Sequence, residues 1–190
     1  MKRGQKYPSE PLTKDEIVAL CNANTNGALG CRNRAALYLL WQCGLRVSEL
    51  LALRPCDVSA DSVRVLRGKG GKSRTVGLST EAAAVAARWM DRRRTLGIDA
   101  RVPLICSLKG EKLYPTAMRE LMKRLARKAG IVKRVHPHAL RHSFAATAAR
   151  QGLPMPSLQN ALGHSSLATT DTYVRSLGGD AVEAVRSLVF

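Results

Sequence analysis

The chain has 190 residues, enough for one sizeable domain or two very small ones, and 45% are apolar, so we expect a packed core rather than wholesale disorder. Lys and Arg number 31 against 14 Asp and Glu, which gives a formal net charge of +17. A chain this basic is attracted to polyanions, and nucleic acid is the first candidate; a ribosome-like or merely soluble basic protein is the alternative.

The sequence has neither a membrane segment nor a disulfide pattern. No apolar run approaches the roughly 20 residues that span a bilayer, and no apolar signal core follows the basic N-terminus MKRGQKYPSEP. The five cysteines are odd in number and lack CxxC spacing, so we expect reduced thiols. These features predict a cytoplasmic, nucleoid-associated protein with no membrane contact.

The first part of the chain is a loose basic arm, residues 1–11, followed by helices. Thr13 and Glu16 stand in the Thr-x-x-Glu order of a capping box, which opens a helix. The next two helices stop at Gly44 and before Pro55. The expected helices cover residues 13–22, 32–42 and 47–53.

The pattern then changes period. Val63 and Val65 alternate with Arg64 and Leu66 in residues 62–68, and a second extended segment covers residues 74–78. The loop GKGGKS between them predicts a β-hairpin with a basic, glycine-rich tip.

Helical patterns fill most of the remaining chain. Pro115 suits the first turn of a helix, and Gly130 suits a helix end. The segment VPLICS reads as a short extended piece. Together these elements predict a mostly α fold with a small antiparallel β-sheet (α+β), in one compact domain. The expected helices cover residues 80–95, 115–128, 138–151, 155–162 and 167–175, with a helical tail over 177–190.

One helix carries a basic stripe. Arg119, Lys123 and Arg127 are four residues apart, so they share one helix face. The stripe either faces phosphates or is an ordinary solvated face, and the net charge favours phosphates.

Three of the four histidines lie in the segment HPHALRH. A zinc site would need further ligands, and no Asp or Glu lies between Ile131 and Thr170, so no metal is expected. His138 and Arg141 are three apart and project from one helix face, where an imidazole and a guanidinium would make an anion site. His136 and His142 are expected to be structural or peripheral.

Further along the chain, several short segments complete a pattern. Arg46 and Glu49 stand in GLRVSE, Lys69 stands in RGKGGKSRTVGL, His164 follows LG, and Tyr173 comes nine residues later. With HALRH, these segments resemble the tyrosine recombinase (phage integrase) family over residues 12–176, and are similar to the single-domain invertases and to Xer and integrase catalytic domains.

The resemblance implies a site-specific recombinase that breaks and rejoins DNA through a covalent 3′-phosphotyrosine, without a cofactor. It implies the catalytic set Arg46, Lys69, His138, Arg141, His164 and Tyr173. Chemistry agrees with these roles. A Tyr phenolate can store the bond, arginines can neutralise charge on the phosphate oxygens, Lys69 can protonate the leaving 5′-oxygen, and His138 can accept the Tyr173 proton. Glu49 would orient a neighbouring His or Arg rather than react.

The sequence leaves several alternatives open. Lys72 competes with Lys69, whereas Tyr7, Tyr38 and Tyr114 lack the upstream LGH. The segment SFAATAARQGLPMPSLQNALGHSS also resembles a helix-turn-helix, so a non-catalytic DNA-binding protein is one alternative. A type IB topoisomerase-like activity is another. The expected DNA-contacting residues are Lys72, Arg74, Arg119, Lys123 and Arg127.

The resemblance also bears on assembly. Family members usually carry a separate N-terminal domain, whereas about 11 residues precede the catalytic region here. The implied partners are double-stranded DNA recombination sites, further copies of the chain (dimer to tetramer on DNA) and accessory DNA-bending proteins. In the tail, Val182, Val185 and Leu188 form an apolar stripe. The tail either exchanges between protomers or folds back on its own domain.

Overall fold

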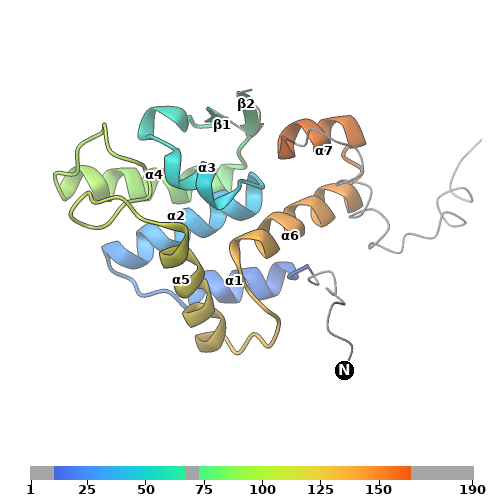
Figure 1. The fold of residues 1–190 in the computed structure, drawn as a ribbon, viewed down its shortest axis with the longest axis horizontal. Helices are drawn as coiled ribbons and strands as arrows, with labels where there is room; N and C mark the ends of the chain where they lie inside the picture. Colours follow the sequence, from blue (N-terminus) through green and yellow to red (C-terminus); the bar gives the residue numbers. More distant parts are fainter. Residues whose placement is uncertain (1–10, 67–72, 164–190) are drawn as a thin grey trace, which may run out of the picture.

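A computed structural model describes residues 11–66 and 73–163 of the chain. The architecture is mostly helical with one two-stranded antiparallel sheet, as predicted (Figure 1). The elements are α1 (Lys14–Asn22), α2 (Ala28–Gln42), α3 (Val47–Ala52), the 3-10 helix η1 (Pro55–Asp57), β1 (Ser62–Val65), β2 (Arg74–Gly77), α4 (Thr80–Thr95), α5 (Pro115–Lys128), α6 (Pro137–Arg150) and α7 (Met155–Leu162).

The first helix begins where its sequence predicts. The Thr13 side chain accepts from the Glu16 N–H, and the Glu16 carboxylate accepts from the Thr13 N–H at 2.7 Å, which completes the capping box. The second helix begins at Ala28, four residues before the expected start. Its N-cap is Gly27, which has no side chain to mark the position, so nothing in the local pattern showed this boundary.

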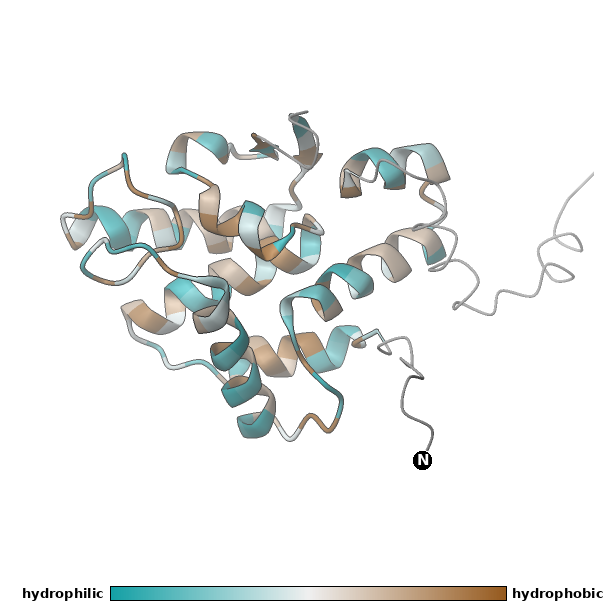
Figure 2. Cartoon of the chain, in the orientation of Figure 1, coloured by the Kyte–Doolittle hydropathy of each residue, from teal (hydrophilic) through white to brown (hydrophobic). Residues whose placement is uncertain are grey.

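Helix α2 lies at the centre of the fold and packs against both α4 and α6. Its core positions are fully buried, and its residues Leu37, Leu39 and Leu40 are 0% exposed. Burial on nearly all sides explains why α2 is apolar around much of its circumference, whereas exposed helices show separate polar and apolar faces (Figure 2). The helix therefore forms the support on which the elements of the candidate site rest.

The loop after α4 is held by side chains of that helix. Trp89 donates its indole N–H to the Leu104 carbonyl at 2.8 Å. Arg93 is 2% exposed and donates to several carbonyls of the same loop, including Asp99 at 2.9 Å. The expected extended piece 102–107 forms no regular strand; one isolated bridge joins Cys106 to Lys112.

The expected hairpin is confirmed. β1 and β2 pair in antiparallel register, with Ser62 opposite Gly77 and Val65 opposite Arg74. Both strands end earlier than expected, and the loop 67–72 lies outside the described residues, as do the expected helix 167–175 and the tail 177–190. All five cysteines carry free thiols. Among the described helices, none is long and apolar enough to cross a membrane.

Candidate active site

The HPHALRH segment forms the start of α6. His136 is the N-cap, and its Nδ1 accepts a hydrogen bond from the Ala139 N–H at 3.2 Å, while Pro137 occupies the first helical turn. The segment therefore begins a helix, and His138 and Arg141 lie in the first turns of that helix. His136, expected to be structural, has a defined part in this start.

The three histidine rings lie close together. The rings of His138 and His142 meet edge to face with centroids 4.2 Å apart, and those of His136 and His138 stack at 6.4 Å. Partial desolvation, together with the positive charges of Arg141 and Arg46, lowers the pKa of His138 below its usual 6.5. A neutral imidazole, which can accept a proton, is therefore favoured at neutral pH.

Arg46 lies at the start of α3, close to α6. It is the N-cap residue of α3, and its backbone N–H donates to Glu49 Oε2 at 2.8 Å. The Arg46 guanidinium donates to Glu49 Oε1 at 2.7 Å and to the Gly163 carbonyl at 3.0 Å. Its side chain remains 29% exposed, so the guanidinium is held on one side and open to solvent on another.

Arg141 lies deeper, with only 2% of its surface exposed. Its two terminal nitrogens donate to the carbonyls of Gly44 and Leu162, each at 2.6 Å. Glu49 Oε2 lies 4.0 Å from Arg141 Nη1. Glu49 therefore has the contacts expected of a carboxylate that orients arginines.

Arg74 belongs to the same cluster, which the sequence did not indicate. It was expected to contact DNA, but its side chain is only 10% exposed and bonds to protein groups instead. Nη1 and Nη2 donate to the two oxygens of Glu49 at 2.9 and 2.8 Å, and Nε donates to the Ala161 carbonyl at 2.8 Å. These contacts place Arg74 in the internal framework of the site, and its expected contact with DNA stays a prediction.

The carboxylate of Glu49 is the negative centre of this cluster. Burial alone would raise its pKa, but the bonds and charges of Arg74 and Arg46 outweigh burial and lower the pKa to about 2. Glu49 is consequently ionised at neutral pH, although it is only 7% exposed. Its charge offsets part of the repulsion among Arg46, Arg74 and Arg141.

The remaining expected catalytic residues, Lys69, His164 and Tyr173, lie outside the described residues, as does Lys72. Two rival tyrosines can be placed. Tyr38 is 8% exposed, and its hydroxyl donates to Glu81 at 2.8 Å; burial, followed by that hydrogen bond, raises its pKa, which makes it a poor nucleophile. Tyr114 immediately precedes α5 and is 62% exposed.

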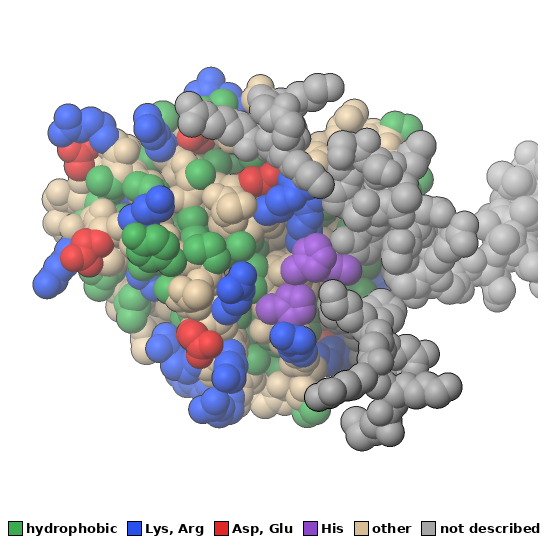
Figure 3. Space-filling view, in the orientation of Figure 1, with side chains coloured by type: hydrophobic (Ala, Val, Ile, Leu, Met, Phe, Trp, Pro, Cys, Tyr) green, Lys and Arg blue, Asp and Glu red, His purple; other side chains and the backbone are tan. Residues whose placement is uncertain are grey.

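The basic stripe of α5, residues Arg119, Lys123 and Arg127, is exposed to solvent as expected. Lys and Arg side chains gather over α5 on the same face that shows histidine side chains (Figure 3). A single large polyanion could therefore contact both regions of this face.

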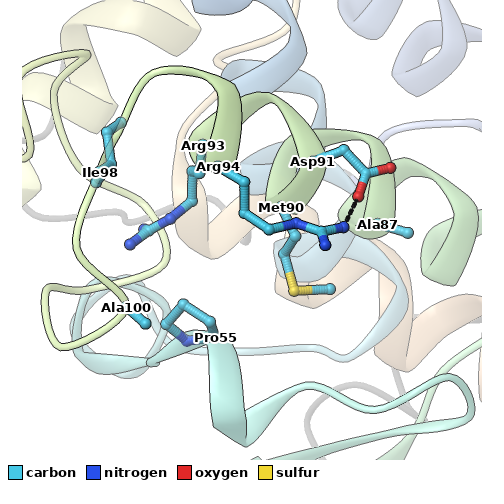
Figure 4. Close-up of a pocket in the computed structure, with 8 residues that line it drawn as sticks. All are labelled: Pro55, Ala87, Met90, Asp91, Arg93, Arg94, Ile98 and Ala100. Carbon is cyan, nitrogen blue, oxygen red and sulfur yellow. Dashed lines mark hydrogen bonds and ion pairs between the residues drawn. The ribbon is translucent and has the colours of Figure 1, made fainter.

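A separate hollow of about 310 Å³ lies at the carboxyl half of α4, lined mainly by apolar atoms of residues such as Met90, Ile98 and Pro55 (Figure 4). Arg94 pairs with Asp91 at its edge. It contains none of the expected site residues. Within residues 11–66 and 73–163, no group of three or more His, Cys, Asp or Glu side chains is placed to hold a metal ion.

Comparison with known proteins agrees with the sequence resemblance. Residues 10–178 match the model of the "Phage integrase family". The tyrosine recombinase XerC of Xanthomonas campestris pv. campestris (strain B100) is 40% identical over 174 residues, which cover 90% of this chain and 52% of XerC. The chain thus spans about half the length of the curated relatives it matches.

Solved structures show the same fold. The crystal structure of XerA recombinase superposes with a TM-score of 0.84 at 30% identity and covers all of this chain and 68% of XerA. XerH site-specific recombinase, in a post-cleavage complex with a palindromic difH substrate, has a TM-score of 0.76 at 25% identity, covering 94% of this chain and 53% of XerH.

Proposed function

Because the chain belongs to the phage integrase family of tyrosine recombinases, we propose that it breaks and rejoins double-stranded DNA at specific sites. The observation that carries this proposal is the convergence of Arg46, at the start of α3, with His138 and Arg141 of α6. Two guanidiniums beside a neutral imidazole suit a phosphodiester whose charge increases in the transition state.

The proposed reaction conserves the energy of the phosphodiester bond. The Tyr173 hydroxyl loses its proton to His138 and attacks the phosphorus, forming a 3′-phosphotyrosine as the bond to the 5′-oxygen breaks. Lys69 gives a proton to the departing 5′-oxygen, while Arg46, Arg141 and His164 neutralise the nonbridging oxygens. A 5′-hydroxyl then attacks the phosphotyrosine and reverses these steps, so no cofactor is consumed.

A nicked duplex tests this proposal. A nick close to the cleaved bond lets the short leaving strand diffuse away, so the covalent complex accumulates. Because the target sequence is unknown, we would use a library of nicked duplexes with random bases around the nick, and recover the adduct from a denaturing gel. Tyr173→Phe should bind the recovered duplex without forming the adduct. Absence of an adduct with the unaltered chain, or an adduct that survives Tyr173→Phe, would refute the assignment.

We propose that the α5 stripe binds DNA phosphates together with Lys72, which lies outside the described residues. Changing Arg119, Lys123 or Arg127 to Gln should weaken binding similarly for all sequences. Each change should also reduce the dependence of log Kd on log salt concentration, by about one for each phosphate that is no longer neutralised. Equal salt slopes for the variants and the unaltered chain would count against this role of the stripe.

We also propose that copies of the chain assemble on DNA in the cytoplasm, as dimers to tetramers, with the tail 177–190 exchanged between protomers. Deleting residues 180–190 should then reduce assembly on the recovered duplex without abolishing binding of a single copy. Unchanged assembly would instead favour a tail folded on its own domain.

A further inference from the structure

Three arginines from distant parts of the chain meet the end of one helix. The last carbonyls of α7 have no partners within the helix and form its negative end. The carbonyls of residues 161, 162 and 163 accept hydrogen bonds from Arg74 Nε, Arg141 Nη2 and Arg46 Nη2, respectively. The helix end therefore holds all three guanidiniums in one arrangement.

Arg74 makes the most extensive of these connections. It joins three elements: β2, on which it lies; α3, through both oxygens of Glu49; and α7, through the Ala161 carbonyl. Glu49 in turn accepts from both the backbone N–H and the guanidinium of Arg46. Arg74 consequently limits where the Glu49 carboxylate can lie, and Glu49 limits where Arg46 can lie.

The Arg74 guanidinium packs closely against the backbone of Gly163. Gly163 has φ +62°, in the left-handed region, where a residue with a Cβ is strained. A Cβ there would lie 2.9 Å from Arg74 Nη1 and 3.2 Å from its Cζ. The Arg74 guanidinium therefore lies against the Gly163 backbone at the end of α7.

We propose that Arg74 is a positioning residue for DNA cleavage, which acts through Glu49 to hold the Arg46 guanidinium in the orientation that receives the phosphate. This inference rests on the proposed function. Arg74 need not touch DNA to act in this way, because its side chain is 10% exposed and its three nitrogens are bonded to protein.

Lysine cannot replace this arrangement, although it keeps the charge. A guanidinium offers two parallel N–H groups to a carboxylate and a third to a carbonyl, whereas an ammonium is a single point donor. Arg74→Lys should therefore leave Glu49 ionised but freer to rotate, and Arg46 with it. Such a change alters the geometry of the site more than its charge.

The test uses the 190-residue chain and the nicked duplex recovered with it. We would compare Arg74→Lys with Arg64→Lys, a matched control on the paired strand β1, where Arg64 is exposed and pairs only loosely with Asp57 at 3.5 Å. Each protein in excess is mixed with labelled duplex, and covalent complex is followed in time. The rate constant reports site geometry, and the amplitude reports the fraction of competent protein.

We expect Arg74→Lys to lower the rate constant by about tenfold, less than the roughly 10²–10³-fold effect of removing a whole oxyanion donor, while Kd for DNA changes by less than about twofold. The penalty should shrink on a duplex with a methylphosphonate at the cleaved position, because one charged oxygen is then absent. Arg64→Lys should react like the unaltered chain. If Arg74→Lys does not fold, Arg74→Gln, whose amide N–H can reach only one of the acceptors that the guanidinium binds, should slow the reaction in the same way.

Three results would overturn the proposal. One is a rate constant for Arg74→Lys equal to that of Arg64→Lys. Another is a loss confined to the amplitude, as a purely structural residue would give. The last is an equal penalty on the phosphate and methylphosphonate duplexes. These differ from failure of the proposed function, in which the unaltered chain itself forms no covalent complex.

Discussion

The ionised carboxylate of Glu49 stabilises the folded protein, and its lowered pKa sets the size of this effect. Its pKa lies at about 2 in the folded protein, against an ordinary value of 4.5. Each pKa unit corresponds to about 1.36 kcal/mol, so the ionised carboxylate contributes about 3 kcal/mol at pH 7. Glu49→Gln keeps the shape of the side chain but removes the charge, leaving Arg46, Arg74 and Arg141 without their common counter-charge. We expect it to destabilise the fold by about that amount, consistent with the cost of breaking a buried pair on one side.

The dependence on pH follows from the sign of the change. Folding lowers the pKa of Glu49, so its contribution is fully present above the unfolded value of 4.5 and is lost as the pH falls toward about 2. The difference between Glu49→Gln and the unaltered chain should shrink from about 3 kcal/mol at pH 7 to about 1.4 kcal/mol at pH 3.

Urea unfolding followed by tryptophan fluorescence measures this difference. Trp41 and Trp89 are 8% and 0% exposed, so both report loss of the core. Glu120→Gln is the matched control, because Glu120 is exposed on α5 and the change in net charge is the same. The control should change the free energy of unfolding by less than about 0.5 kcal/mol. The same urea midpoint and slope for Glu49→Gln and the unaltered chain at pH 7 would refute the reasoning.

Three further changes test other parts of the fold by the same urea assay. His136→Ala should lower the free energy of unfolding by about 1 kcal/mol, because it removes the cap on the Ala139 N–H, whereas His136→Ser should retain the cap. Burial, followed by the charge of Arg134, lowers the His136 pKa. Part of the stability that the cap contributes should therefore be lost as the pH falls below 6.5. Gly44→Ala should cost about 2 kcal/mol or more, since φ is +57° and a Cβ would lie 2.4 Å from the Phe144 ring; a neutral effect would mean that the ring moves freely. Arg93→Met should free the loop after α4 and lower the free energy of unfolding by about 2–4 kcal/mol. The freed loop should also be cut faster by a protease within residues 96–106. Unchanged cleavage would contradict the role of the bonds from Arg93 to the loop carbonyls.

The sequence predicted most elements because their determinants are local. The capping box at Thr13, the proline at the start of α5 and the alternation of β1 each depend on residues a few positions apart. The start of α2 was missed because Gly27 has no side chain to show an N-cap. Motif identity likewise marked Arg46, His138 and Arg141 without knowledge of their positions in space.

The partners of those residues depended on packing. In the sequence, Arg74 is one more basic residue beside a glycine-rich loop. In the fold it bonds to Glu49 and Ala161, which are 25 and 87 residues away along the chain. Arg141 similarly reaches the Gly44 carbonyl across 97 residues. Local pattern carries no information about such contacts, because they depend on how α3 and α6 pack on α2 and how α7 packs on α6 and β2. The sequence thus determined the family, the fold class and the candidate groups. Only the tertiary structure decided that Arg74 belongs to the internal framework of the site. The physical reason is that a buried guanidinium bonds to whichever carbonyls and carboxylates the packed helices bring to it.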